Sequence, residues 1–155
     1  MGGAISSVPD PRVTGRLNSS VRAQIMFKAI SFDPGAAFNG IPEIVHVEYD
    51  LAVLRLSLEF EEQLGPVYLE FERIGGFRVL DEGQLSAFWG KEHRADGWLW
   101  EVKSGGWYAL ESTRDDFVMG LTPLGKGPRE FIVLGVDDCV SVITWAEPRV
   151  QVAGP

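Results

Sequence analysis

Hydrophobic and polar residues alternate with a period of two along much of the chain after residue 21. In residues 52–60, Leu54, Leu56 and Leu58 alternate with polar side chains, and residues 67–73 repeat the pattern. In residues 44–50, Val45 and its alternate neighbours are expected on the buried side. Such alternation is typical of antiparallel strands with one buried and one solvated face. The pattern therefore predicts half-buried strands in the first half of the chain.

Two segments near the C-terminus are apolar at both odd and even positions. They cover residues 130–136 and 139–146, and two aspartates join them. A strand that is apolar on both sides is typically covered on both faces of its sheet. We therefore expect these two segments to be central strands.

A tryptophan-rich block between residues 77 and 107 predicts a strand, a short helix and a hairpin. Asp81 can cap a helix over residues 82–89. Gly105 and Gly106 can supply the positive φ angles of a tight turn between strands 98–103 and 107–111. Large aromatic side chains contribute much of a core. This block is therefore expected to organise the fold, and three tryptophans are expected in the core: Trp98, Trp100 and Trp145.

Together the segments number about nine strands and one or two short helices. This count indicates a mainly β protein, a single-domain antiparallel barrel or sandwich. Residues 1–20 are rich in Gly, Ser and Pro and are expected to form a flexible N-terminal arm. Residues 21–155 are expected to form the single β-rich domain.

Composition suggests a cytoplasmic protein that does not enter a membrane. The 155 residues include one cysteine, which is typical of a reducing compartment. No apolar run reaches the roughly 18 residues that a transmembrane helix needs.

Acidic charge is concentrated in one part of the chain. The formal net charge is −8, and residues 43–82 contain ten acidic residues against three basic ones. A surface of this sign repels nucleic acid, because phosphate neutralisation supplies most of that affinity. It attracts a basic protein and accelerates the encounter with it.

The acidic residues of this segment fall on the polar side of three consecutive predicted strands. If these strands are neighbours in a meander, their polar faces combine into one acidic patch. The residues predicted to bind a basic partner are Glu48, Asp50, Glu59, Glu70 and Glu72.

An alternative is a β-barrel that binds a small ligand or acts on carbohydrate through Glu70, Glu72 and Glu101. Glycosidases of this kind place two carboxylates across a cleft. Alternation, however, puts Trp98 and Trp100 on the face opposite Glu101, so these rings would not line a groove with that acid. A solvated polar sheet face is the more usual explanation of such residues. A structural or assembly subunit is the third possibility.

Motifs for catalysis, metal binding and cofactor binding are missing from the sequence. Cys139 follows two aspartates, which would raise the pKa of its thiol, so a buried structural cysteine is expected. His46 and His93 are far apart in sequence and have no metal-ligand spacing. We therefore predict no catalytic residues, no metal and no cofactor.

The segments FERIGGFRVLDEGQLSAFW, WEVKSGGW and FIVLGVDDCVSVITW, within residues 67–146, resemble small bacterial proteins of unknown function. Some proteins of this kind are immunity proteins of contact-dependent or secreted toxin systems. The resemblance implies a small, acidic, cytoplasmic protein that neutralises a cationic toxin by charge-complementary binding, and it implies no catalytic residues. The leading hypothesis is therefore a non-enzymatic binding protein with an acidic sheet face.

Overall fold

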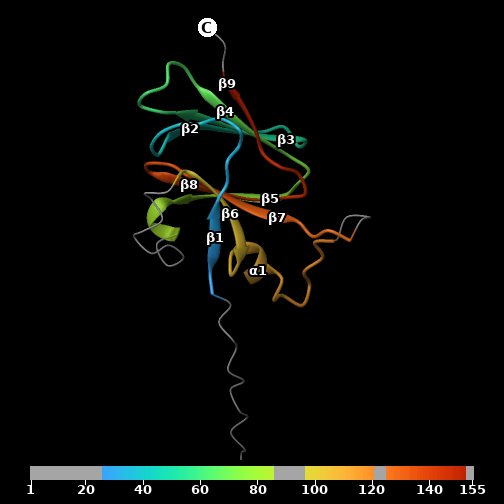
Figure 1. Cartoon of the computed structure of the whole chain (residues 1–155). Coiled ribbons are helices and arrows are strands. Elements are labelled where there is room, and N and C mark those ends of the chain that lie inside the picture. Colours follow the sequence, from blue (N-terminus) through green and yellow to red (C-terminus); the bar gives the residue numbers. More distant parts are fainter. Residues whose placement is uncertain (1–25, 86–96, 121–124, 153–155) are drawn as a thin grey trace, which may run out of the picture.

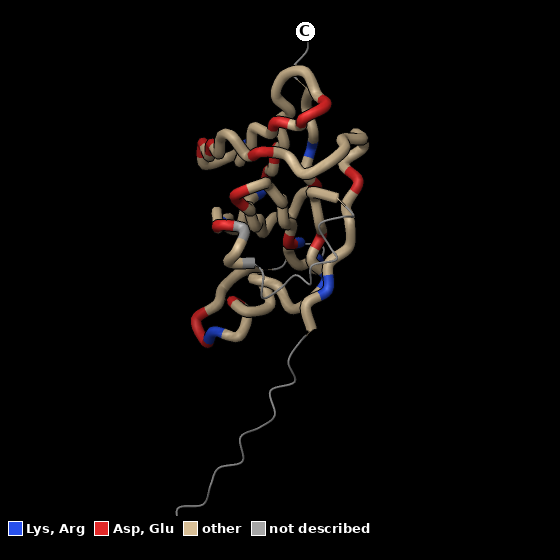
Figure 2. The backbone as a smooth tube through the Cα atoms, turned by 90° about the vertical axis from the view of Figure 1, so that its left-hand side faces the viewer, with Lys and Arg blue, Asp and Glu red and all other residues tan. Residues whose placement is uncertain are grey.

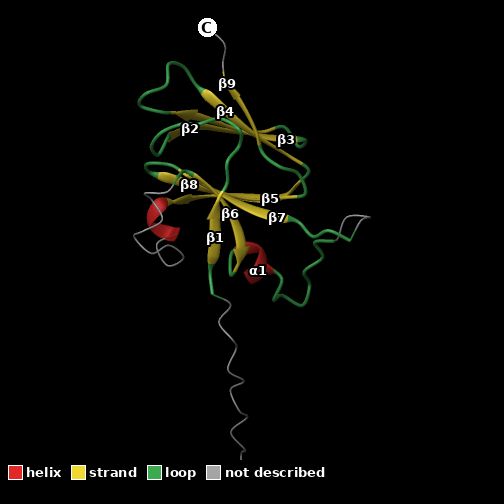
Figure 3. Ribbon diagram, viewed as in Figure 1, coloured by secondary structure: helices red, strands yellow, loops and turns green. Residues whose placement is uncertain are grey.

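The computed structural model describes residues 26–85, 97–120 and 125–152, which form two stacked antiparallel sheets (Figures 1 and 3). The four-stranded sheet has the order β2 (Glu43–Tyr49), β3 (Val53–Glu59), β4 (Val67–Glu72) and β9 (Arg149–Val152). The five-stranded sheet has the order β1 (Lys28–Ser31), β6 (Leu99–Ser104), β7 (Arg129–Leu134), β8 (Asp138–Thr144) and β5 (Ile74–Asp81). The mainly β prediction is confirmed. Of the two architectures left open, the fold is a sandwich, because the two sheets remain separate.

The main core lies between the two sheets. Alternate residues of β3 and β4, including Leu56 and Leu69, are fully buried there against Phe131 and Val142 of the opposite sheet. Each such side chain contributes about 1.5–3 kcal/mol through removal of its surface from water. The alternation predicted for residues 52–60 and 67–73 is therefore confirmed.

The alternation predicted in β2 is wrong at Val45. Ile44 pairs with Leu58, and the next pair joins His46 to Ser57, so Val45 is the extra residue of a β-bulge. The bulge moves Val45 to the outside, where 43% of it is exposed, while Ile44 packs against the core. Because β2 is an edge strand of its sheet, the bulge does not disrupt a second neighbour within the described residues.

Strands β7 and β8 lie in the interior of the five-stranded sheet, as predicted. Their inner faces belong to the main core. Their outer faces contribute Ile132, Leu134 and Cys139 to a second apolar cluster, together with Trp100 and Val102 of β6. Burial on both sides explains why these segments show no alternation.

The predicted hairpin around Gly105 and Gly106 does not form. After Gly105, which has a φ of +70°, Trp107–Glu111 continues as the short helix α1. Its first N–H groups are bound by Glu130 of β7: Trp107 N donates to Oε1 at 2.9 Å and Tyr108 N to Oε2 at 2.8 Å. Strand β6 instead pairs with β1 and β7. A contact across the fold thus overrides the local turn signal.

Other predictions from the tryptophan-rich block are borne out in part. The predicted helix after Asp81 begins as the 3-10 helix η1 (Glu82–Leu85), and Asp81 Oδ1 accepts a hydrogen bond from Gly83 N at 2.9 Å. Trp98 and Trp100 are buried, as expected, whereas Trp145 is only half-buried.

Some predictions lie outside the described residues, namely the flexible arm over residues 1–20, the rest of the predicted helix to residue 89, and His93. Among the helices that the structure does describe, none is both long and apolar enough to cross a membrane.

Candidate functional site

The outer face of the four-stranded sheet holds most of the predicted binding residues. Strands β2, β3 and β4 are consecutive neighbours, as the meander hypothesis required, and β9 joins them beside β4. In Figure 2, acidic residues are spread over the molecule, and several of them lie in its upper part, where this sheet lies in Figure 1. The outward side chains of the four strands meet in rows across the sheet, because paired residues share a face.

One row alternates in charge: Glu48, Arg55, Glu70 and Arg149 are successive cross-strand neighbours. Arg55 Nε and Nη2 each lie 2.7 Å from Glu70 Oε1, and Gln151 Nε2 donates to Glu70 Oε2 at 2.9 Å. The hydrogen bond that Arg55 donates to Glu70 raises the pKa of Arg55. Glu70 is only 7% exposed. The Glu70 carboxylate is therefore held by hydrogen bonds within the sheet, and its charge is not accessible to a partner.

Two other acids of the predicted set differ in how far they are neutralised. Glu72 forms an ion pair with Arg149 of β9. Glu48 Oε2 lies 3.8 Å from Arg55 Nη1, and 57% of the Glu48 side chain is exposed. Glu48 thus keeps much of its charge accessible, whereas Glu72 is already engaged by a cation.

Asp50 closes the turn between β2 and β3. Its Oδ1 accepts hydrogen bonds from Ala52 N at 2.9 Å and Val53 N at 2.7 Å. These backbone donors, Val53 first, lower the pKa of Asp50. They also hold Leu51 in a left-handed conformation with a φ of +74°. Asp50 is solvent-exposed, but its carboxylate already has this structural role.

Acidic charge without a cation gathers at the other end of β2 and β3. Glu43 and Glu59 are direct cross-strand partners, and both are exposed. Within the described residues, no ion pair joins either of them to a basic side chain. Glu61 and Glu62 follow in the next turn and are also exposed. Like charges placed opposite each other destabilise a sheet, so the pairing of Glu43 with Glu59 lowers the stability of the fold.

Sequence reasoning missed Glu43 as a site residue, although it counted its charge. Its position opposite Glu59 depends on the register of β2 against β3, and the bulge at Val45 sets that register. A signal was present in the acidic content of residues 43–62, but not in the alternation of any single strand.

A neutral polar row lies beside the charged one. His46, Ser57, Tyr68 and Gln151 are successive neighbours across the four strands. With Glu48 and Arg55 they line a hollow of about 360 Å³. Hydroxyl, imidazole and amide groups provide hydrogen-bonding capacity without net charge. The hollow is thus suited to hold a polar side chain from a partner.

Glu101 does not join the other carboxylates, because it belongs to the five-stranded sheet. Arg129 donates to both of its oxygens, from Nε and Nη2 at 2.9 Å each, and Lys103 Nζ lies 2.7 Å from Oε1. The hydrogen bonds from Arg129, together with the contact to Lys103, lower the pKa of Glu101, and burial opposes them only in part. Glu70, Glu72 and Glu101 therefore do not form one catalytic pair or cleft.

We expect the stability contributed by Glu101 to depend on pH. Its lowered folded-state pKa means that this contribution is present above the ordinary glutamate pKa of about 4.3. It is lost as the pH falls through the folded-state value. Glu101→Gln should lower the free energy of unfolding by about 1 kcal/mol at pH 7 and by much less near pH 3. Urea denaturation at several pH values measures the difference.

The control for this experiment is Glu147→Gln, which removes a 69% exposed partner of Arg129. It should have a smaller effect at every pH. An effect of Glu101→Gln that did not change with pH would show that packing, not the charge, carries the contribution.

Cys139 and His46, which were considered for thiol and metal chemistry, lie on different sheets. Cys139 is 1% exposed on β8, as expected for a structural cysteine. His46 is exposed on β2. Across residues 26–85, 97–120 and 125–152, no group of three or more His, Cys, Asp or Glu side chains is placed to hold a metal ion.

Comparison with known proteins returned no matching family model, no matching curated protein and no matching solved structure.

Proposed function

We propose that the protein is a non-enzymatic binding protein that holds a basic protein partner on the outer face of its four-stranded sheet. The observation that carries this proposal is the exposed Glu43–Glu59 pair, two like charges placed opposite each other, with which no basic side chain in the described part of the chain forms an ion pair. A cationic partner would turn this repulsion into attraction. Such complementarity mainly increases association rate and specificity.

The remainder of the face can determine how the partner is oriented. Glu48 extends the acidic end toward the centre, and 45% of the Arg55 side chain and 60% of the Arg149 side chain are exposed. The hollow beside His46 and Tyr68 can take one polar side chain. A partner with mixed charges is therefore favoured over a uniform polycation, because the charges of the partner have to be complementary to the alternating charges of this row.

An immunity protein that occludes a cationic toxin is the specific form of this proposal that the sequence resemblance suggests. The carbohydrate-active alternative has less support, because Glu70 is bonded to Arg55 and Gln151 and Glu101 is bonded to Arg129. Neither carboxylate is free to act as a nucleophile or general acid beside the other.

The test compares two double variants that change the net charge equally. Glu43→Lys with Glu59→Lys reverses the acidic end, while Asp115→Lys with Asp137→Lys reverses two exposed acids in other loops. A basic protein recovered on the immobilised wild type is purified, and its association rate is measured at several ionic strengths. We expect the first variant to associate about tenfold or more slowly, with a weaker dependence on salt. The control should behave like the wild type.

Equal slowing by both double variants would show that net charge, and not this face, attracts the partner. Unchanged binding to the first variant would contradict the proposal altogether. A proton NMR spectrum of each variant checks that the fold is retained.

A further inference from the structure

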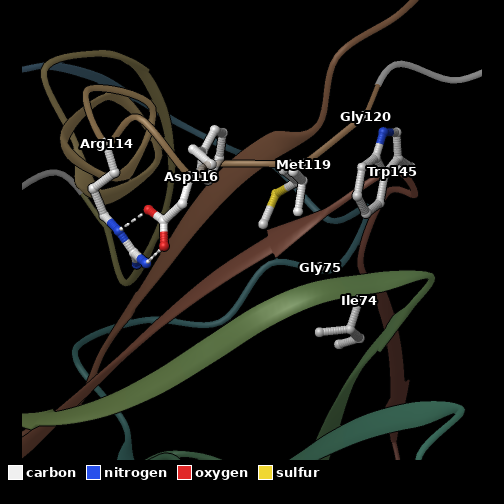
Figure 4. A pocket seen from close by; sticks show the side chains of 9 residues that line it. Ile74, Gly75, Arg114, Asp116, Met119, Gly120 and Trp145 are labelled. Atoms are coloured by element: carbon white, nitrogen blue, oxygen red, sulfur yellow. Dashed lines mark hydrogen bonds and ion pairs between the residues drawn. The ribbon is translucent and has the colours of Figure 1, made fainter.

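A second hollow lies away from the four-stranded sheet, where the segment over residues 114–120 packs against β5 and the residue after β8. Its volume is about 450 Å³, within the range of small-molecule sites. Figure 4 shows Trp145 and Met119 on one side of it and the Arg114–Asp116 pair on the other. Ile74 lies on β5 below them. Apolar, polarisable side chains therefore line one side of the hollow, and a charged pair lines the other.

Gly75 of β5 allows the two apolar side chains to lie against the strand. The register between β5 and β8 shifts at this residue, which forms a bulge between Ile74 and Gly76. A Cβ atom on Gly75 would lie 3.0 Å from both Met119 Sδ and Trp145 Cζ3. Because Gly75 has no side chain, Met119 and Trp145 can lie close to the backbone of β5. Bulges such as this one are frequent beside functional sites.

The indole N–H of Trp145 is buried and has no hydrogen-bond acceptor among the residues that the structure describes. Two other indoles of the protein differ: Trp100 Nε1 donates to Gly97 O at 3.1 Å, and Trp107 Nε1 donates to Glu111 Oε1 at 3.0 Å. A buried donor without an acceptor is costly, and native proteins contain few of them. An acceptor that reached Trp145 would remove this cost.

Charge at the edge of the hollow limits what can bind. Arg114 donates from Nε and Nη2 to the two carboxylate oxygens of Asp116, at 3.1 and 3.0 Å, and from Nη1 to Glu111 Oε2 at 2.8 Å. One cation is thus surrounded by two anions, so no positive charge remains for an anionic ligand. A neutral ligand is favoured.

We propose that this hollow binds a small, flat, mainly apolar and neutral molecule that carries one hydrogen-bond acceptor. Its ring packs against Trp145 and Met119, and its acceptor takes the Trp145 N–H. The unbranched side chain of Met119 has three rotatable bonds and can move aside to give access. The site is independent of the proposed protein-binding face, because none of its lining residues belongs to β2, β3, β4 or β9.

The test uses three probes of similar size, added to the full ¹⁵N-labelled chain and followed by NMR. Acetophenone has a ring and a carbonyl acceptor, ethylbenzene has the ring without an acceptor, and benzoate is an anion. Acetophenone should shift the indole N–H signal of Trp145 in a saturable way. Its affinity should exceed that of ethylbenzene by about fivefold, the usual worth of one hydrogen bond. Benzoate should bind least.

Two variants separate the N–H from the ring. Trp145→Phe, which also assigns the signal, should reduce the preference for acetophenone over ethylbenzene to about one. Trp100→Phe is the matched control, because its indole N–H already has an acceptor, and it should keep the preference. A wild-type protein whose Trp145 signal responds to neither neutral probe would overturn the proposal, whatever the variants do. Equal preference in wild type and Trp145→Phe, or tightest binding of benzoate, would also contradict it.

Discussion

Glu130→Ala should lower the free energy of unfolding by about 3 kcal/mol and release helix α1 from the sheet. Glu130 is 4% exposed, and its two oxygens bind the N–H groups of Trp107 and Tyr108. Alanine would leave both donors without an acceptor inside the protein. The helix has five residues and no side-chain cap on Gly106, so it is too short to persist alone.

Gly106 packs closely against the Glu130 side chain that binds helix α1. A Cβ atom there would lie 2.5 Å from Glu130 Oε2 and 2.6 Å from Val102 Cγ1. Gly106→Ala should therefore displace Glu130 and destabilise α1 without removing the carboxylate. Hydrogen exchange of the amides of residues 107–111 measures the release, and urea denaturation measures the loss of stability. Unchanged protection of these amides in Glu130→Ala would show that Glu130 does not anchor the helix.

The pH dependence provides a second test of Glu130. Burial raises its pKa, and the two backbone hydrogen bonds only partly oppose that effect. The folded state therefore holds the proton more tightly than the unfolded state. The corresponding stability is present below the ordinary glutamate pKa and is lost as the pH rises through the folded-state value. Relative to Glu130→Gln, the wild type should thus become less stable as the pH rises from 4 toward neutrality.

The second large effect is expected at Glu70. Glu70→Lys should lower the free energy of unfolding by about 3 kcal/mol, because it places a buried cation between two arginines. Its cross-strand neighbours are Arg55 and Arg149, and 7% of the residue is exposed. The hydrogen bonds from Arg55 and Gln151 would be lost together.

Glu48→Lys is the matched control, on the same row and with the same change of charge. Its side chain is 57% exposed, so the free energy of unfolding should change little. Urea denaturation at neutral pH compares the two variants. Equal stability of both would show that Glu70 is not a structural residue and that it belongs with the accessible acids. The comparison also decides which acids can be reversed in a binding experiment without damage to the fold.

The strands were the most predictable part of the fold. The inward leucines of β3 and the inward apolar residues of β4 follow a period of two that no other regular structure produces. The two fully apolar segments were recognised as central strands for a different local reason, because they are apolar on both faces. In contrast, the outward position of Val45 can be predicted only if the bulge in β2 is known. The helix over Trp107–Glu111 can be predicted only if its contact with Glu130, which lies 22–23 residues away in sequence, is known.

The location of the proposed binding face was predictable from the sequence, but its accessible charge was not. The meander of β2, β3 and β4 brought the acids together, as alternation suggested. Arg149 and Gln151 arrive on β9, about 80 residues after Glu70, and they neutralise or bind part of the predicted set. Glu43, which sequence reasoning had left out, is more accessible than Glu70, which it had included.

By itself, the sequence determined the fold class, most of the strands and the segment that carries the acidic charge, because each depends on the order of residues along one strand. The tertiary structure alone decided which charges remain accessible, that a helix replaces the predicted hairpin, and that the indole N–H of Trp145, which lines a hollow, has no acceptor within the described ranges. These properties depend on partners far apart in sequence, and the register and stacking of the sheets bring those partners together.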